Sequence, residues 1–139
     1  RSHRAGYQVE PPRDNAADVV ILCATIVYPV SAKPCELLLV KQFRPPVNTD
    51  VVEFVGGLCG EAESAEACAR RELFEEVGFQ AGVVVRHVSE RCMAVDAGLC
   101  STKAMLVFAD IDGDLPDNQT LHSCPEEDEH IDVLRVPFG

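Results

Sequence analysis

Three glutamates within five residues, Glu72, Glu75 and Glu76, are the side chains of this 139-residue chain best suited to chemistry. On an α-helix, Glu75 lies about 60° to one side of Glu72 and Glu76 about 40° to the other. Carboxylates at this spacing repel one another by roughly 0.2–0.5 kcal/mol per pair. A divalent cation relieves that repulsion, and hard carboxylate oxygens suit Mg2+ or Mn2+. The spacing therefore predicts a metal site on one side of a helix.

The glutamates belong to a longer pattern of fixed spacing, GLCGEAESAEACARRELFEEVGF, over residues 57–79. Its other constrained positions are two glycines, a glutamate, an arginine and two apolar residues: Gly57, Glu63, Arg71, Leu73, Gly78 and Phe79. The pattern resembles the Nudix box, the signature of hydrolases that cleave nucleoside diphosphates linked to another moiety. The alternative is an ordinary solvated acidic helix face. That alternative accounts for adjacent glutamates but leaves the glycines and Glu63 unexplained.

The resemblance implies roles for the residues of the box. Glu72, Glu75 and Glu76 are the expected metal ligands, and Glu72 and Glu76 are the firmest because residues four apart face the same way. The backbone carbonyl of Gly56, just before the box, is expected to add a ligand. We expect Arg71 to orient the glutamates through charge-assisted hydrogen bonds, and we place Arg71 and Glu75 in the catalytic group.

A second cluster, KQFRPP at residues 41–46, is followed nine residues after Arg44 by Glu53. Taken alone, an arginine at a strand end is more often a surface charge. Together with the box, the cluster resembles the ADP-ribose and ADP-sugar pyrophosphatase branch of the Nudix family. The resemblance implies that Arg44 binds phosphate, for which its planar guanidinium is suited, and that Glu53 binds near the sugar or the metals. Arg13 is a further candidate for substrate contact.

Two loops complete the expected site. Glu129 matches a loop glutamate that activates the attacking water in this branch, and His130 is the alternative base. Asp96 and Gly98 resemble a substrate-binding Asp-Pro-Gly loop, except that Ala97 replaces the proline that marks ADP-ribose specificity. The branch also stacks adenine on a tryptophan, and this chain has none. The resemblance to the branch makes ADP-ribose the first candidate substrate, while these two departures loosen the choice of base. The alternatives are a UDP-sugar, an oxidised nucleoside diphosphate, or nucleotide-sugar binding without hydrolysis.

The elements that must position these side chains follow from local patterns. Ser64 is a good N-cap, apolar residues recur every four positions from Ala65 to Val77, and Gly78 fits a left-handed stop, which predicts a helix over 65–77. Apolar, β-branched runs predict strands at 19–28, 36–43, 51–55, 83–88, 104–109 and 131–136, with an acidic loop over 110–129. These elements indicate an α+β class with a mixed sheet. The resemblance implies the Nudix fold, a mixed β-sheet sandwiched between helices (α/β/α), whose C-terminal helix we do not find.

The whole chain predicts one domain over residues 19–139 behind an N-terminal arm at 1–18. A net charge of −11 argues against general binding to nucleic acid or anionic membrane, and no apolar stretch approaches a membrane span. Seven scattered cysteines without a C-x-x-C pair favour a reducing compartment, the cytoplasm. The resemblance implies a small nucleotide sugar as ligand and a homodimer. Because the chain begins at Arg1 rather than methionine and stops soon after the last predicted strand, we expect it to be a fragment or an incompletely ordered protein.

Overall fold

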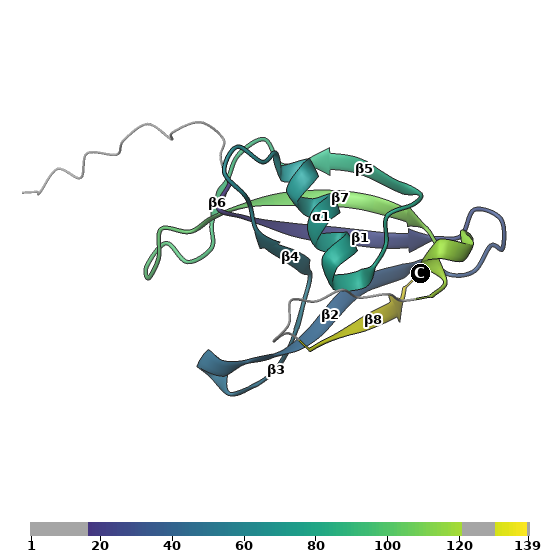
Figure 1. Cartoon of the computed structure of the whole chain (residues 1–139), viewed down its shortest axis with the longest axis horizontal. Coiled ribbons are helices and arrows are strands. Elements are labelled where there is room, and N and C mark those ends of the chain that lie inside the picture. The colour runs from purple at the N-terminus through teal and green to yellow at the C-terminus, as the bar shows by residue number, and fades with distance from the viewer. Residues whose placement is uncertain (1–16, 121–129, 139) are drawn as a thin grey trace, which may run out of the picture.

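The computed structural model describes residues 17–120 and 130–138, in which eight strands form one mixed sheet beside a single α-helix (Figure 1). The strands are β1 Val19–Val27, β2 Glu36–Arg44, β3 Thr49–Glu53, β4 Val55–Leu58, β5 Val83–Val88, β6 Met93–Ala94, β7 Lys103–Asp112 and β8 Ile131–Pro137. The helix is α1 Ala65–Val77, and two short 3-10 helices are η1 Pro45–Val47 and η2 Pro116–Asn118. The predicted α+β class and mixed sheet are confirmed.

Strand β1 is the centre of the sheet, whose main order is β3-β2-β1-β7-β5. It pairs in parallel with β7 along its whole length, and the other pairings are antiparallel. On its other edge, the first half of β1 pairs with β4 and the second half with β2. Strand β2 also pairs with β3 and β8. This branching brings the C-terminal half of β2 close to β4, where the box begins.

Helix α1 covers one face of the sheet, over β1 and β7 (Figure 1). Along β1, every second residue is buried on that face: Val20, Leu22, Ala24 and Ile26. The helix contributes the apolar stripe that its four-residue period predicts, and Ala69, Leu73 and Val77 are buried in the same core. Amphipathic periods of two in the strand and about four in the helix therefore build the interface that orients α1.

Both ends of α1 lie where the sequence predicts them. The Ser64 hydroxyl accepts a hydrogen bond from the Ala67 backbone N–H at 3.2 Å, which satisfies one otherwise unpaired donor of the first turn. Gly78 adopts φ 85°, and its N–H donates to the carbonyl of Phe74 at 2.8 Å. A left-handed residue of this kind favours glycine, so the helix ends there.

The predicted third strand was wrong in one respect: residues 49–58 form two strands, and the glycine pair belongs to the second. We expected Gly56 and Gly57 to end a strand, whereas β4 runs through them and pairs with β1. A Cβ on Gly56 would lie 2.2 Å from the carbonyl oxygen of Val20. Glycine is therefore required by close backbone approach within the sheet, a role that a sequence pattern does not distinguish from a turn.

The remaining differences lie near β7. This strand extends to Asp112, so the acidic segment begins later than predicted, and the two-residue strand β6 was not predicted. The part of the acidic segment at 121–129 and residues 1–16 of the predicted arm lie outside the described residues. The 13 residues of α1, the longest helix in the described part of the chain, fall short of a membrane span, which needs about 20 apolar residues.

Candidate active site

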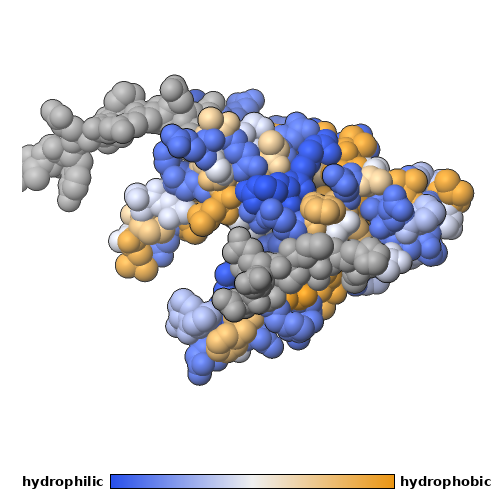
Figure 2. Space-filling model, in the orientation of Figure 1, coloured by the Kyte–Doolittle hydropathy of each residue, from blue (hydrophilic) through white to orange (hydrophobic). Residues whose placement is uncertain are grey.

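A cavity of about 480 Å³ opens where the N-terminal part of β1, the end of β2, β4 and one side of α1 meet. Six of the predicted site residues line it: Arg44, Gly56, Arg71, Glu72, Glu75 and Glu76. The other lining residues are Val19, Gln42, Gly57 and Leu58. In the space-filling view, hydrophilic side chains gather over α1 (Figure 2). The fold thus brings two sequence clusters some 30 positions apart to one hollow.

The three glutamates of α1 differ in burial. Glu72 and Glu76 are 9% and 7% exposed, whereas the side chain of Glu75 is 44% exposed. Oε2 of Glu76 accepts a hydrogen bond from the Gly56 backbone N–H at 3.3 Å. The Glu72 carboxylate occupies the space that a side chain at Gly57 would take, since a Cβ there would lie 2.4 Å from the carboxyl carbon. Gly57 therefore leaves room for the Glu72 carboxylate, while the backbone N–H of Gly56 contacts Glu76.

Arg71 connects the loop glutamate of the box to the helix glutamates. Its Nε and Nη2 donate to Glu63 at 3.0 Å each, and its Nη1 donates to Glu72 at 2.8 Å and to Glu75 at 2.9 Å. Nη2 also donates to the carbonyl of Leu58 at 2.8 Å, which ties the loop after β4 to α1. This is the orienting geometry expected of Arg71, because each carboxylate is held by a charge-assisted hydrogen bond.

The same network shifts the protonation equilibria of the site. Hydrogen bonds from Arg71 and Gly60 lower the pKa of Glu63 to about 2, and the surrounding carboxylates raise the pKa of Arg71. Glu72 is shifted in the opposite direction, because burial raises its pKa despite its contact with Arg71. A buried carboxylate with a raised pKa gains from a further positive charge nearby.

The residues of the cavity fit a divalent cation by the chemistry of their donors. Two buried carboxylates, the half-exposed carboxylate of Glu75 and the backbone of Gly56 offer the oxygen ligands that Mg2+ prefers. In the described ranges, no three acidic, histidine or cysteine side chains are grouped as a preformed metal cluster. Arg71 supplies the positive charge between Glu72 and Glu75 in this arrangement.

Arg44 reaches the cavity from the last position of β2. Its Nε donates to Oε2 of Glu53 at 2.8 Å and its Nη2 donates to Oε1 at 3.3 Å, so one edge of the guanidinium holds the carboxylate. The β2–β3 register places Glu53 opposite Val40, on the face of the sheet that also holds Arg44. The predicted pair is therefore together at the rim of the cavity.

The structure does not bring every predicted residue into this hollow. Asp96 and Gly98 form a turn in which Oδ1 of Asp96 accepts from the Gly98 N–H at 3.1 Å, and neither is among the described residues lining the cavity. Glu129 and Arg13 lie outside the described residues. His130 pairs with Asp132 at 3.4 Å. The assignments of these residues remain predictions.

Sequence reasoning missed Gln42, which lines the cavity and is only 9% exposed. The available signal was its position two residues before Arg44 on the same strand, because alternate residues of a strand share a face. A glutamine carries no charge, so the sequence alone indicates no binding role for it beside Arg44.

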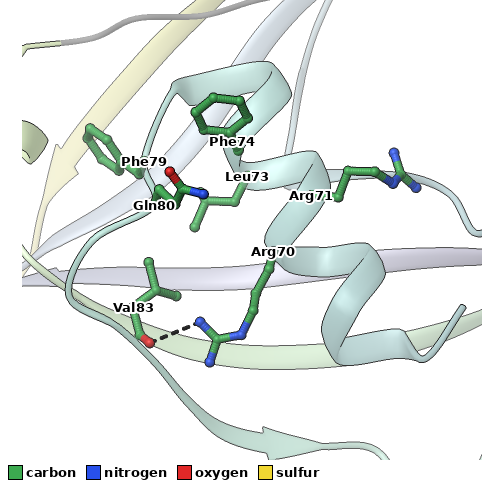
Figure 3. Close-up of a pocket in the computed structure, with 7 residues that line it drawn as sticks. All are labelled: Arg70, Arg71, Leu73, Phe74, Phe79, Gln80 and Val83. Carbon is green, nitrogen blue, oxygen red and sulfur yellow. Dashed lines mark hydrogen bonds between the residues drawn. The ribbon is translucent and has the colours of Figure 1, made fainter.

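A second cavity, of about 310 Å³, lies on a different side of α1 (Figure 3). Its lining is mostly apolar, with Leu73, Phe74, Phe79 and Val83. Neighbouring Arg70 and Arg71 point in different directions: the Arg70 side chain reaches β5, where Nη1 donates to the Val83 carbonyl at 3.1 Å (Figure 3). Arg70 thus contacts the sheet and Glu66, whereas Arg71 contacts the glutamates of the first cavity.

The family model for the NUDIX domain matches residues 22–138, and this chain belongs to the Nudix family. The resemblance inferred from the box is thereby confirmed. The chain is 40% identical over 100 residues to putative nudix hydrolase 2 of Caenorhabditis elegans, and 35% identical over 112 residues to the ADP-ribose pyrophosphatase of Saccharomyces cerevisiae. The matches cover 72% and 81% of this chain but only 44% and 47% of those proteins, so it spans about half their length.

Solved structures confirm the Nudix fold. The crystal structure of a C. elegans Ap4A hydrolase binary complex matches with a TM-score of 0.59 and 16% identity, covering 86% of this chain and 79% of that one. The crystal structure of an ADP compounds hydrolase matches with a TM-score of 0.55 and 18% identity over 87% of this chain and 58% of that chain. Identities this low establish a shared fold only.

Proposed function

We propose that this chain is a Mg2+-dependent hydrolase of nucleoside diphosphate sugars, with ADP-ribose as the first substrate and AMP and ribose 5-phosphate as products. The observation that supports this most is the common cavity of the box glutamates and Arg44. Acidic oxygens suit a divalent cation, and a guanidinium suits a phosphate, so the lining matches both halves of a cation–diphosphate complex. The names of relatives in yeast and mouse, ADP-ribose pyrophosphatase and ADP-sugar pyrophosphatase, support the same substrate class.

In this proposal Glu72, Glu75, Glu76 and the Gly56 carbonyl would hold the cation. When bound, Mg2+ supplies positive charge against the diphosphate and the attacking water, with Mn2+ as a substitute. Arg71 keeps the carboxylates oriented through its existing hydrogen bonds. A cation held by Glu72 and Glu75 would compete with Arg71 for these carboxylates, and Arg71 would keep its hydrogen bonds to Glu63.

The chain's own residues then bind the substrate and move a proton. Arg44 holds a phosphate oxygen pair while Glu53 fixes the direction of its guanidinium. Glu129 is the proposed base that accepts the proton of the attacking water, and cleavage leaves one phosphate on each product. Asp96, Gly98 and Arg13 are proposed to contact the sugar and base.

We further propose that the protein acts in the cytoplasm as a homodimer. The six cysteines in the described part of the chain are free, which supports a reducing compartment. The homodimer follows from the family resemblance, and light scattering of the purified protein tests it directly.

The activity is tested by incubating the protein with ADP-ribose, UDP-glucose and 8-oxo-dGDP, with and without Mg2+, and analysing products by mass spectrometry. We expect AMP and ribose 5-phosphate from ADP-ribose only when Mg2+ is present. In water enriched in 18O, one product should contain a single solvent oxygen. Mg2+-dependent binding without any product would instead favour a nucleotide-sugar binding module.

The site is tested with Glu76→Gln, which keeps the shape of the side chain but removes its charge. We expect turnover to fall about 100-fold or more while the unfolding temperature stays near that of the wild type. Glu66→Gln is the matched control, because Glu66 lies in the first turn of the same helix and pairs with Arg70. A fully active Glu76→Gln protein would contradict the metal assignment.

A further inference from the structure

Among the described residues that line the proposed active site, Gln42 is the only one with a side-chain amide. It belongs to β2, where Val40, Gln42 and Arg44 share the face turned towards α1. Val40 is buried in the core and Arg44 reaches the rim, so Gln42 lies between the apolar core and the charged edge of the cavity. Its exposed fraction is 9%.

No hydrogen bond within residues 17–120 and 130–138 involves the carboxamide of Gln42. Among these residues only Asn118 Oδ1 is a fully buried side-chain atom without a partner, so the Gln42 amide keeps access to the cavity that it lines. Other donors at the cavity are engaged there: the Arg71 guanidinium contacts Glu63, Glu72, Glu75 and the Leu58 carbonyl, and the Gly56 N–H donates to Glu76. An accessible amide at the wall of a cavity can form hydrogen bonds with a group that enters it, which an apolar residue at this position could not do. The amide is therefore explained best by a group that enters the cavity.

The chemistry of that group follows from the charges around Gln42. Carboxylates of Glu72, Glu75 and Glu76 dominate the lining and only accept hydrogen bonds. A diphosphate also presents only acceptors, and it must approach Arg44, two residues along the same strand. A neutral NH2 group can donate to a phosphate oxygen without adding charge to the acidic cavity.

We propose that the side-chain amide of Gln42 is a substrate-binding group that donates a hydrogen bond to a non-bridging oxygen of the diphosphate. This inference rests on the proposed function. Gln42 and Arg44 then form a pair on one strand that holds the diphosphate from the side opposite the glutamates of α1. Because the contact is made to the ground-state substrate as well as the transition state, it acts mainly on KM.

The test compares Gln42→Met with wild type, using ADP-ribose with Mg2+ for kinetics and its α,β-methylene analogue for calorimetric binding. Methionine has a similar length but no donor. We expect kcat/KM to fall about 10- to 100-fold, as for a lost hydrogen bond to a charged group, with most of the change in KM. Binding of the analogue should weaken by a similar factor. Gln80→Met is the control, because Gln80 is an exposed residue lining the cavity in Figure 3.

Gln42→Glu gives a second, independent readout. A carboxylate of the same shape would face the diphosphate, so we expect a larger loss of kcat/KM than in Gln42→Met. Mn2+ affinity measured without substrate should be unchanged in Gln42→Met. Unchanged kcat/KM and analogue affinity in Gln42→Met, or weakened Mn2+ binding in that variant, would overturn the inference.

Different results would overturn the proposed hydrolase activity and the proposed role of Gln42. A wild-type protein that neither cleaves nor binds these nucleotides overturns the proposed function and the role of Gln42 together. A wild type that cleaves ADP-ribose, together with a Gln42→Met variant of equal kcat/KM, overturns only the role of Gln42. Thermal unfolding of each variant checks that a loss of activity is not a loss of fold.

Discussion

Gly56 and Gly57 are neighbours in β4, yet an added Cβ at each would meet a different part of the molecule. At Gly56 it would collide with the Val20 backbone carbonyl at 2.2 Å, and at Gly57 with the flexible carboxyl end of Glu72 at 2.4 Å. Backbone in a paired strand cannot move aside, whereas a glutamate side chain can rotate. The first glycine thus serves the fold and the second serves the site.

We therefore predict opposite effects of two alanine substitutions. Gly56→Ala should lower the free energy of unfolding by about 1–3 kcal/mol, because β1 and β4 must separate. Gly57→Ala should leave stability nearly unchanged but displace Glu72, reducing Mg2+-dependent turnover about 10-fold or more. Urea unfolding and product assays measure the two quantities. Equal stability losses in both variants would refute this division of roles.

Glu63 makes the stability of the fold depend on pH in the acid range. Its pKa is lowered from 4.5 to about 2 in the fold, mainly by hydrogen bonds from Arg71. A carboxylate whose pKa is lowered by folding stabilises the folded state at pH values above its unfolded-state pKa. This contribution is lost as the pH falls from 4.5 towards 2. In Glu63→Gln, the free energy of unfolding should therefore fall less steeply across this window.

Urea unfolding at several pH values between 4.5 and 2 checks this prediction. Glu61→Gln is the control, because Glu61 is an exposed residue of the same loop. Parallel pH profiles for wild type and Glu63→Gln would show that the Arg71 contact does not stabilise the fold. The burial that raises the pKa of Glu72 acts in the opposite direction, but it is common to all three proteins.

At the scale of single elements, the position of α1 decides whether its glutamates reach the cavity. The helix is held by its caps and by the stripe buried against β1, so its acidic side must face β4. Arg71 adds a link from the helix to the loop after β4 through the Leu58 carbonyl. The element is thus oriented by apolar burial and then adjusted by charged contacts.

Loss of the N-cap should loosen the start of this helix. We predict that Ser64→Ala lowers the free energy of unfolding by about 1 kcal/mol, because the Ala67 N–H loses its acceptor. Ser64→Asp should retain most of the stability, since aspartate caps equally well and its charge favours the helix N-terminus. Urea unfolding distinguishes them. A Ser64→Ala protein as stable as the wild type would mean that the cap contributes little.

At the scale of the whole molecule, Asn118 joins segments far apart in the chain. It is fully buried, and its Nδ2 donates to the carbonyls of Ala81 at 2.9 Å and Asp112 at 2.8 Å. Its own carbonyl accepts from Nη2 of Arg135 in β8 at 2.8 Å. One side chain and its backbone therefore fasten the loop after α1, the end of β7 and the last strand.

We predict that Asn118→Ala lowers the free energy of unfolding by about 2 kcal/mol, because two partly buried carbonyls lose their donor. Asp117→Ala, at the exposed neighbouring position, should change it by less than about 0.5 kcal/mol. Denaturant unfolding of both variants measures the difference. An Asn118→Ala protein as stable as wild type would show that water replaces the amide without cost.

Local features of this fold could be predicted because their causes are local. The ends of α1 depend on Ser64 and Gly78, and β1 depends on a run of apolar, β-branched residues. The third strand could not be divided correctly, because the role of Gly56 depends on the Val20 carbonyl more than 30 residues away. Gln42 was missed for a similar reason: its burial depends on strands β3 and β8, which pair with β2, and not on its own sequence neighbours.

The sequence by itself determined the chemistry of the box, because the helical period places Glu72, Glu75 and Glu76 on one side of any helix that contains them. Only the tertiary structure decided which groups meet those carboxylates. The pairing of β1 with both β4 and β2 brings Arg44 and Gln42 to the cavity, and Arg71 becomes a link between loop and helix. Such contacts join residues distant in the chain, so they depend on packing that no local pattern specifies.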